Sequence, residues 1–214
     1  MKRYLVLLFV LLFFGSFISE KPKIVIIGDS ISIGYTPFVK EALTNEAIVK
    51  HNPGNAQHTG TGLLKLEEWL NEEVWDIIQF NWGLWDLCYR HPDAKVYGNR
   101  DKINGSITFT VEEYKRNLEK LVQQLKKTNA KLIFVTTSFI PEGEAGRFKG
   151  DEIQYNKAAK QIMKKNGILI NDIHKASKQI HKKHMKEEGD VHFTEKGYEL
   201  LAVEITNFIK KEIN

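Results

Sequence analysis

The alternation of short β-branched runs with longer helical stretches constrains the fold of this chain most. Five apolar runs are predicted to be strands: residues 23–27, 48–51, 76–80, 131–136 and 168–170. Helical spacing predicts helices at residues 37–44, 62–71, 111–127 and 152–165, and a last helix after Thr194. Strands separated by helices form parallel sheets through right-handed crossovers. The sequence therefore predicts an α/β fold, a three-layer αβα arrangement of flavodoxin-like architecture around a five-stranded parallel sheet.

The first apolar run ends in a turn that contains Gly28, Asp29 and Ser30. Gly28 permits positive φ or a close backbone approach, and a helical pattern beginning near Tyr35 would direct its N–H groups toward Ser30. A hydroxyl in that position can act as a nucleophile beside donors for an oxyanion. Gly-Asp-Ser is also ordinary punctuation between a strand and a helix, so the motif alone leaves both interpretations open.

A second candidate segment, 189–198, precedes the last predicted helix and contains Asp190 and His192. An imidazole titrates near neutral pH and could take the Ser30 proton during attack. A carboxylate would then hold the other ring nitrogen. Asp190 is the nearest acid, Glu188 and Asp172 are weaker candidates, and a Ser/His dyad supported by a backbone carbonyl is the alternative.

Four segments carry a family resemblance: Gly28-Asp29-Ser30-Ile31, Asn52-Pro53-Gly54, Gly83-Leu84-Trp85-Asp86 and Gly189-Asp190-Val191-His192. With them the chain resembles the GDSL esterase/lipase family, the SGNH hydrolases. The resemblance implies the SGNH αβα fold and ester hydrolysis through an acyl-enzyme on Ser30, without a cofactor. Two positions depart from the family pattern. Trp85 stands where the family has an oxyanion-hole asparagine, and Gly189 stands three residues before His192, so the acid is displaced to Asp190.

The donors of the oxyanion hole follow only in part from the resemblance. It implies the backbone N–H groups of Ser30 and Gly54. The third donor stays open, because Trp85 offers an indole N–H or a hydrophobic wall, and the side-chain amides of Asn81 and Asn55 are further candidates.

Residues 87–109 form the longest stretch without clear periodicity. They follow the third predicted strand directly, and a long loop at the carboxyl ends of parallel strands is where an α/β sheet binds its ligand. Aromatic and guanidinium groups such as Arg90 are typical of sites for sugars and polar esters. We therefore expect this insertion to line the substrate site; the alternative is a surface excursion with a small hairpin of its own.

The remaining reactive residues have structural interpretations. The single cysteine, Cys88, lacks a surrounding nucleophile motif and is interpreted as a buried structural thiol. His181 and His184 lie in a lysine-rich run that we interpret as a solvated helix end, so no metal site is expected. Removing the two basic residues Lys2 and Arg3 lowers the formal charge from +4 to +2, which gives no argument for a nucleic-acid partner.

Residues 1–19 combine two basic residues, an apolar run and small residues, a pattern typical of a secretory signal peptide. An uncleaved N-terminal anchor is the alternative. We expect residues 20–214 to form the hydrolase domain, secreted or periplasmic, with no stable membrane insertion after cleavage.

Together these features predict a serine ester hydrolase that acts on a small-molecule or glycan ester. A carbohydrate O-acyl ester, in particular an acetyl ester, is the first candidate substrate on the strength of the resemblance and the polar insertion. A lipase or thioesterase is the alternative within the enzyme class, and a non-catalytic binding protein on the same scaffold is the alternative outside it. A flavin or nucleotide binder using the Gly28 turn is disfavoured because it leaves His192 without a use.

Overall fold

The computed structural model describes residues 20–71 and 73–213, so the predicted signal segment lies outside the described residues. A parallel sheet of five strands runs through its centre in the order β2-β1-β3-β6-β7. The prediction of a five-stranded parallel sheet is confirmed. The strands are β1 Lys23–Ile27, β2 Ile48–His51, β3 Ile77–Phe80, β6 Lys131–Val135 and β7 Leu169–Asn171.

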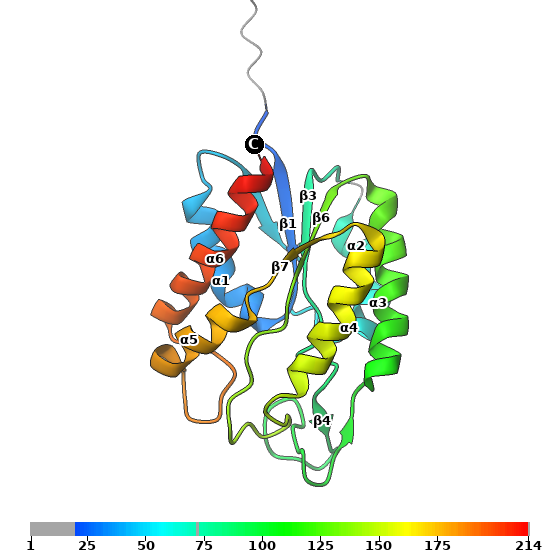
Figure 1. The fold of residues 1–214 in the computed structure, drawn as a ribbon, viewed down its shortest axis with the longest axis vertical. Helices are drawn as coiled ribbons and strands as arrows, with labels where there is room; N and C mark the ends of the chain where they lie inside the picture. The colour runs from blue at the N-terminus through cyan, green and yellow to red at the C-terminus, as the bar shows by residue number, and fades with distance from the viewer. Residues whose placement is uncertain (1–19, 72, 214) are drawn as a thin grey trace, which may run out of the picture.

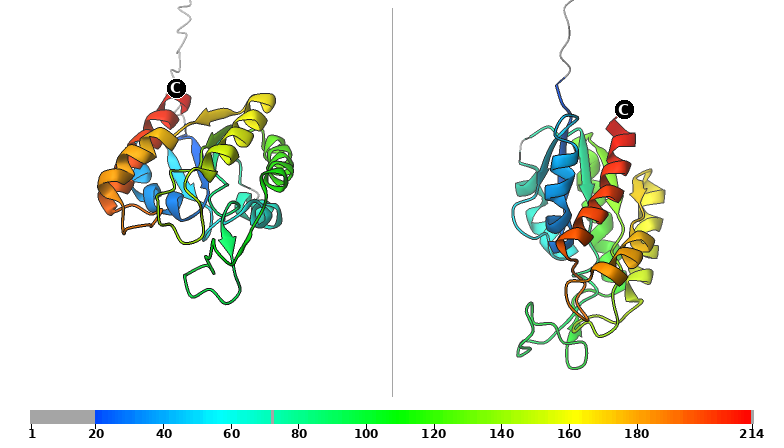
Figure 2. Two further views of the ribbon diagram at one scale, coloured as in Figure 1. Left: turned by 60° about the horizontal axis from the view of Figure 1, so that its bottom comes forward. Right: turned by 90° about the vertical axis from the view of Figure 1, so that its left-hand side faces the viewer.

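Helices cover both faces of this sheet, which confirms the predicted three-layer αβα arrangement (Figures 1 and 2). Ile24, Ile26 and Ile78, in the inner strands β1 and β3, are fully buried, as expected for a sheet covered on both sides. One face carries α1 Ser30–Ala42, α5 His174–His184 and α6 Glu195–Ile213; the other carries α2 Thr59–Leu70, α3 Val111–Leu125 with the 3-10 turn η1 Lys126–Thr128, and α4 Asp151–Asn166.

Helix α1 begins earlier than the sequence pattern predicted. It begins at Ser30, not near Tyr35, because the side chain of Asp29 caps it by accepting a hydrogen bond of 3.0 Å from the Ile31 N–H. This earlier start places Ser30 in the first turn of α1, where backbone N–H groups lack intrahelical acceptors.

The insertion 87–109 leaves the sheet after β3 and projects beyond the carboxyl ends of the strands (Figures 1 and 2). It contains a two-stranded antiparallel hairpin, β4 Tyr89–Arg90 with β5 Ser106–Ile107. The Tyr89 N–H donates to the Gly146 carbonyl at 2.7 Å, and the Lys102 N–H donates to the Ala145 carbonyl at 2.9 Å. These bonds fix the insertion to the loop that precedes α4.

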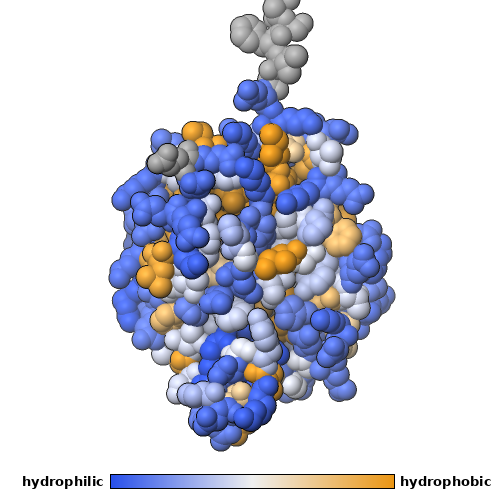
Figure 3. Space-filling model, turned by 180° about the vertical axis from the view of Figure 1, so that it is seen from behind, coloured by the Kyte–Doolittle hydropathy of each residue, from blue (hydrophilic) through white to orange (hydrophobic). Residues whose placement is uncertain are grey.

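Figure 3 shows the face opposite to that of Figure 1, on which hydrophilic side chains dominate and hydrophobic ones occur in small separate groups. Within the described ranges, none of the helices combines the length and the apolar character that crossing a bilayer requires.

Candidate active site

Ser30 and His192 come together at the carboxyl end of the sheet although 162 positions separate them. The Ser30 Oγ lies 2.8 Å from Nε2 of His192, within hydrogen-bond distance. On the other side of the ring, Nδ1 donates to Oδ1 of Asp190 at 2.6 Å. A serine, a histidine and an aspartate are thus connected in the order that nucleophilic catalysis requires.

Asp190 reaches the imidazole across a turn. Its N–H donates to the Glu187 carbonyl at 3.1 Å, and Gly189 has the positive φ of 72° that this turn needs. A side chain at Gly189 would also meet the Gly143 carbonyl oxygen at 2.9 Å. Glycine at this position therefore permits the acid to stand two residues before His192.

Hydrogen bonds fix the Asp190 carboxylate and keep it ionised. Its Oδ1 also accepts the backbone N–H of His192 at 3.1 Å. Burial alone would raise the pKa of Asp190, but the hydrogen bonds and charge of His192 outweigh it, so the pKa lies below its usual value. An ionised carboxylate here would stabilise an imidazolium.

The two weaker candidate acids lie elsewhere. Asp172 accepts a hydrogen bond of 3.0 Å from the Thr136 hydroxyl and pairs with Lys160. Glu188 is exposed to solvent. Neither carboxylate is hydrogen-bonded to His192.

His181 supports the acid from behind, a role that the sequence did not reveal. The interpretation as a solvated helix end is wrong for this residue, because its side chain is buried against the rings of Phe139 and Phe193. Its Nε2–H donates to the backbone carbonyl of Asp190 at 2.7 Å. A helix end rich in lysine thus contributes one inward-facing group that holds the turn.

The backbone around the nucleophile is fixed by the second family segment. Buried Asn52 accepts the Gly28 N–H at 2.9 Å and donates to the Gly54 carbonyl at 3.2 Å. Gly54 has a φ of 68° and is exposed. The turn before Ser30 and the loop containing Gly54 are therefore held together.

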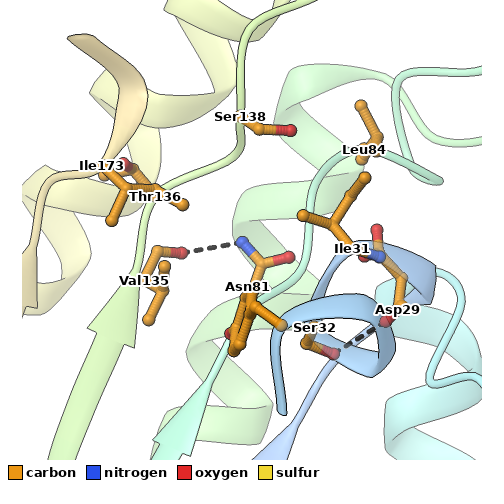
Figure 4. A pocket seen from close by; sticks show the side chains of 10 residues that line it. Asp29, Ile31, Ser32, Asn81, Leu84, Val135, Thr136, Ser138 and Ile173 are labelled. Carbon is orange, nitrogen blue, oxygen red and sulfur yellow. Dashed lines mark hydrogen bonds between the residues drawn. The ribbon is translucent and has the colours of Figure 1, made fainter. Parts of the chain in front are cut away.

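The two candidate amides lie in different places. Asn55 lines the same pocket as Ser30, and its side-chain oxygen accepts the Gln57 N–H at 2.8 Å, which leaves its NH₂ group to donate. Asn81 lines a small interior cavity instead and donates to the Val135 carbonyl at 2.7 Å (Figure 4). The structure therefore does not bring Asn81 into the Ser30 pocket.

The pocket at Ser30 and His192 has a volume of about 90 Å³ and includes Trp85 and Arg90 in its wall. The Arg90 guanidinium lies over the Trp85 ring, with Cζ 4.4 Å from the ring centroid. A wide groove along the insertion shares Trp85, Arg90 and the exposed Tyr97 with this pocket. The insertion thus borders the candidate active site, and it also contains a hairpin of its own.

Two further arginines, Arg100 and Arg147, line the pocket, and both form ion pairs with Glu144. Sequence reasoning did not single out Arg147 or Glu144. Both residues lie in the long segment between β6 and α4, and such segments meet at the carboxyl edge of the sheet. That position is the feature of the sequence that could have pointed to them.

Asp86, in the third family segment, lies beneath the pocket wall. It is fully buried and accepts hydrogen bonds from both the backbone N–H, at 2.9 Å, and the hydroxyl of Thr59. Burial raises the pKa of Asp86 to about 7. Its position indicates a structural role in joining α2 to the segment that contains Trp85.

Cys88 is buried, and burial raises the pKa of its thiol, which is unfavourable for a nucleophile. Over residues 20–71 and 73–213, no cluster of three or more His, Cys, Asp or Glu side chains is placed to hold a metal ion.

Comparison with known proteins identifies related chains. The model of the GDSL-like lipase/acylhydrolase family matches residues 26–200. No curated protein sequence matches significantly.

Solved structures of similar fold include a lipase/acylhydrolase from Enterococcus faecalis, with a TM-score of 0.71 and 23% identity over 89% of this chain and 96% of that one. An acetylxylan esterase from Geobacillus stearothermophilus has a TM-score of 0.66 and 19% identity over 88% and 94% of the two chains. The acetyl xylan esterase AlAXEase has a TM-score of 0.67 and 18% identity over 87% and 99%. At these identities the likeness concerns the fold.

Proposed function

Because this chain belongs to the GDSL-like lipase/acylhydrolase family and is a carboxylic ester hydrolase, we propose that it cleaves carbohydrate O-acetyl esters through an acyl-enzyme on Ser30. The observation that carries the mechanism is the connected set of hydrogen bonds from Ser30 through His192 to Asp190, at 2.8 and 2.6 Å.

Each member of this set has a defined task. The Ser30 hydroxyl attacks the ester carbonyl while Nε2 of His192 takes its proton, and Asp190 stabilises the resulting imidazolium. The imidazolium then protonates the departing alcohol oxygen, leaving the acyl group on Ser30. Water activated by the same imidazole attacks the acyl-enzyme, releasing the carboxylic acid and restoring the Ser30 hydroxyl.

The negative oxygen of the tetrahedral intermediate requires hydrogen-bond donors. The Ser30 N–H, in the first turn of α1, is one donor, and the Gly54 N–H is the second. We assign the third to the Asn55 amide, because Asn55 lines the pocket and its oxygen is already occupied by the Gln57 N–H. Trp85 then serves as a wall of the pocket.

The preference for an acetylated carbohydrate rests on the surroundings of the pocket. Its small volume of about 90 Å³ suits a short acyl group. The adjoining groove offers Trp85 and the exposed Tyr97, and aromatic faces of this kind pack against sugar rings. Two of the structural neighbours are acetylxylan esterases, which agrees with this choice.

The proposal is tested with purified protein that begins at residue 20, assayed against aryl acetate, butyrate and octanoate and against acetylated oligosaccharides. We expect the highest kcat/KM on acetyl esters, and no hydrolysis by Ser30→Ala. A preference for octanoate would favour a lipase. Absence of hydrolysis on every ester, with retained glycan binding, would favour the binding-protein alternative.

A further inference from the structure

Three guanidinium groups border the candidate active site. Arg90 comes from β4, Arg100 from the insertion and Arg147 from the loop before α4, and all three line the pocket that contains Ser30 and His192. A neutral ester offers no charged group that would use such a concentration of positive charge.

The positive charge is only partly compensated within the protein. Buried Glu144 accepts hydrogen bonds from Nη1 of Arg100 at 2.5 Å and from Nη1 of Arg147 at 2.9 Å. Two guanidiniums therefore share one carboxylate. Two other acids lie near the arginines: Asp190 is engaged by His192 at 2.6 Å, and buried Asp29 accepts the Ile31 N–H at 3.0 Å.

Arg90 has only neutral partners in the part of the chain that the structure describes. Its Nε donates to the Thr108 hydroxyl at 3.2 Å, and its Nη1 donates to the Gly98 carbonyl. Its Nη2 is buried, and among the described residues it has no hydrogen-bond partner. Leaving a buried charged donor unpaired is unfavourable. Arg90 keeps a positive charge that no carboxylate of the described residues hydrogen-bonds, and it lies in the wall of the Ser30 pocket, where an anionic ligand group would be stabilised.

The position and shape of Arg90 define that ligand group. Its guanidinium lies over the Trp85 ring, with Cζ 4.4 Å from the centroid, and this contact limits the freedom of the side chain before a ligand binds. A planar guanidinium pairs best with a planar carboxylate. Arg90 lines both the pocket at Ser30 and the wide groove beside it, which places the charge on the larger, alcohol part of the ester.

We propose that the substrate is an acylated acidic sugar, whose ring carries a carboxylate that binds Arg90 while its ester enters the Ser30 pocket. This inference rests on the proposed esterase function and narrows its substrate class to O-acylated uronic acids with a free carboxylate.

The test compares O-acetylated glucuronic acid with its methyl ester, in which the carboxyl group is neutral and carries one additional methyl group. Acetate release is measured at pH 7.5, in 10 mM and in 500 mM NaCl. We expect kcat/KM to be about tenfold or more higher for the free acid at low salt, as for a charged hydrogen bond, and the ratio to fall at high salt. Equal rates on the two sugars at low salt would overturn the proposal without any variant.

Two variants then locate the effect. Arg90→Gln should lower the acid-to-methyl-ester ratio by about tenfold, and Arg90→Lys should restore it only in part, because lysine keeps the charge but loses the planar fork. Lys149→Gln is the matched control: it removes a charge from an exposed side chain, two positions after Arg147, that does not line the pocket. An unchanged ratio in Arg90→Gln, or an equal loss in Lys149→Gln, would contradict the assignment to Arg90.

Further comparisons distinguish a failure of this inference from a failure of the proposed esterase function. Aryl hemisuccinate is compared with aryl butyrate, and a preference for the hemisuccinate with none for the acidic sugar would overturn the placement of the charge on the alcohol side. Aryl acetate hydrolysis that depends on Ser30, without a preference for the acidic sugar, refutes this inference alone. Absence of all ester hydrolysis refutes the proposed function itself.

Discussion

Replacing Asp190 by asparagine removes one charge from the proposed catalytic set and changes little else. The amide is nearly the same size as the carboxylate, and its oxygen can still accept the backbone N–H of His192, which lies 3.1 Å away. We therefore expect Asp190→Asn to fold normally while losing its ability to stabilise the imidazolium.

The size of the loss follows from the geometry. Opposite charges 2.6 Å apart attract by about 6 kcal/mol at an effective dielectric constant of about 20. The side chains of His192 and Asp190 are 30% and 20% exposed, so solvent screening reduces this attraction. A remainder of about 4 kcal/mol corresponds to a fall in kcat of about 10³-fold.

The assay is steady-state hydrolysis of an aryl acetate, with Glu188→Gln and Asp172→Asn as matched controls and circular dichroism to check folding. Both controls should stay within about threefold of wild type, because their carboxylates are not bonded to His192. A fall in kcat of less than about tenfold in Asp190→Asn would refute the electrostatic role. If all three acids were dispensable and His192→Ala were inactive, the enzyme would work as a Ser/His dyad.

Three further predictions concern the support of the site. Burial raises the pKa of Asp86 from its ordinary value of 3.8 to about 7 in the folded protein. The contribution of Asp86 to the free energy of unfolding is therefore complete below about pH 4, where the carboxyl group is protonated in both states. It is lost as the pH rises from there through 7, because the unfolded chain releases the proton first. Urea unfolding of Asp86→Asn should therefore show an unfolding free energy that improves relative to wild type between pH 5 and pH 8; a constant difference would contradict the assignment. His181→Leu leaves the Asp190 carbonyl without its donor, so chemical denaturation should show a loss of about 1–3 kcal/mol and kinetics a lower kcat; unchanged values would exclude a positioning role. Gly34→Ala places a methyl group against the ring of Tyr198, and thermal unfolding should reveal a loss of about 1–3 kcal/mol or more, whereas an unchanged Tm would mean that α1 and α6 can separate easily.

Most of the architecture could be predicted from the sequence because strand and helix periodicities differ so clearly. The capping box at Thr110 and Glu113, for example, marks the start of α3 at Val111. The start of α1 could not be read from periodicity, since Ile31 and Ile33 are β-branched and the deciding contact is the Asp29 side chain. Local capping chemistry thus overrides side-chain preference at this boundary.

In the candidate site, too, some residues could be predicted from the local sequence and others could not. Ser30, His192 and Asp190 follow from motifs in which neighbouring residues carry the signal. The burial of His181 depends on Phe139 and Phe193, which are distant in sequence, so the lysine-rich surroundings misled the local interpretation. The pairing of Arg147 and Arg100 with Glu144 also arises only when two separate loops meet.

The most direct test of the central claim is intact-protein and peptide mass spectrometry after treatment with a fluorophosphonate probe. We expect one covalent adduct on the peptide that contains Ser30, absent in Ser30→Ala and much slower to form in His192→Ala. Labelling that persists in Ser30→Ala, or an adduct on another residue in the wild type, would contradict the assignment of Ser30 as the nucleophile.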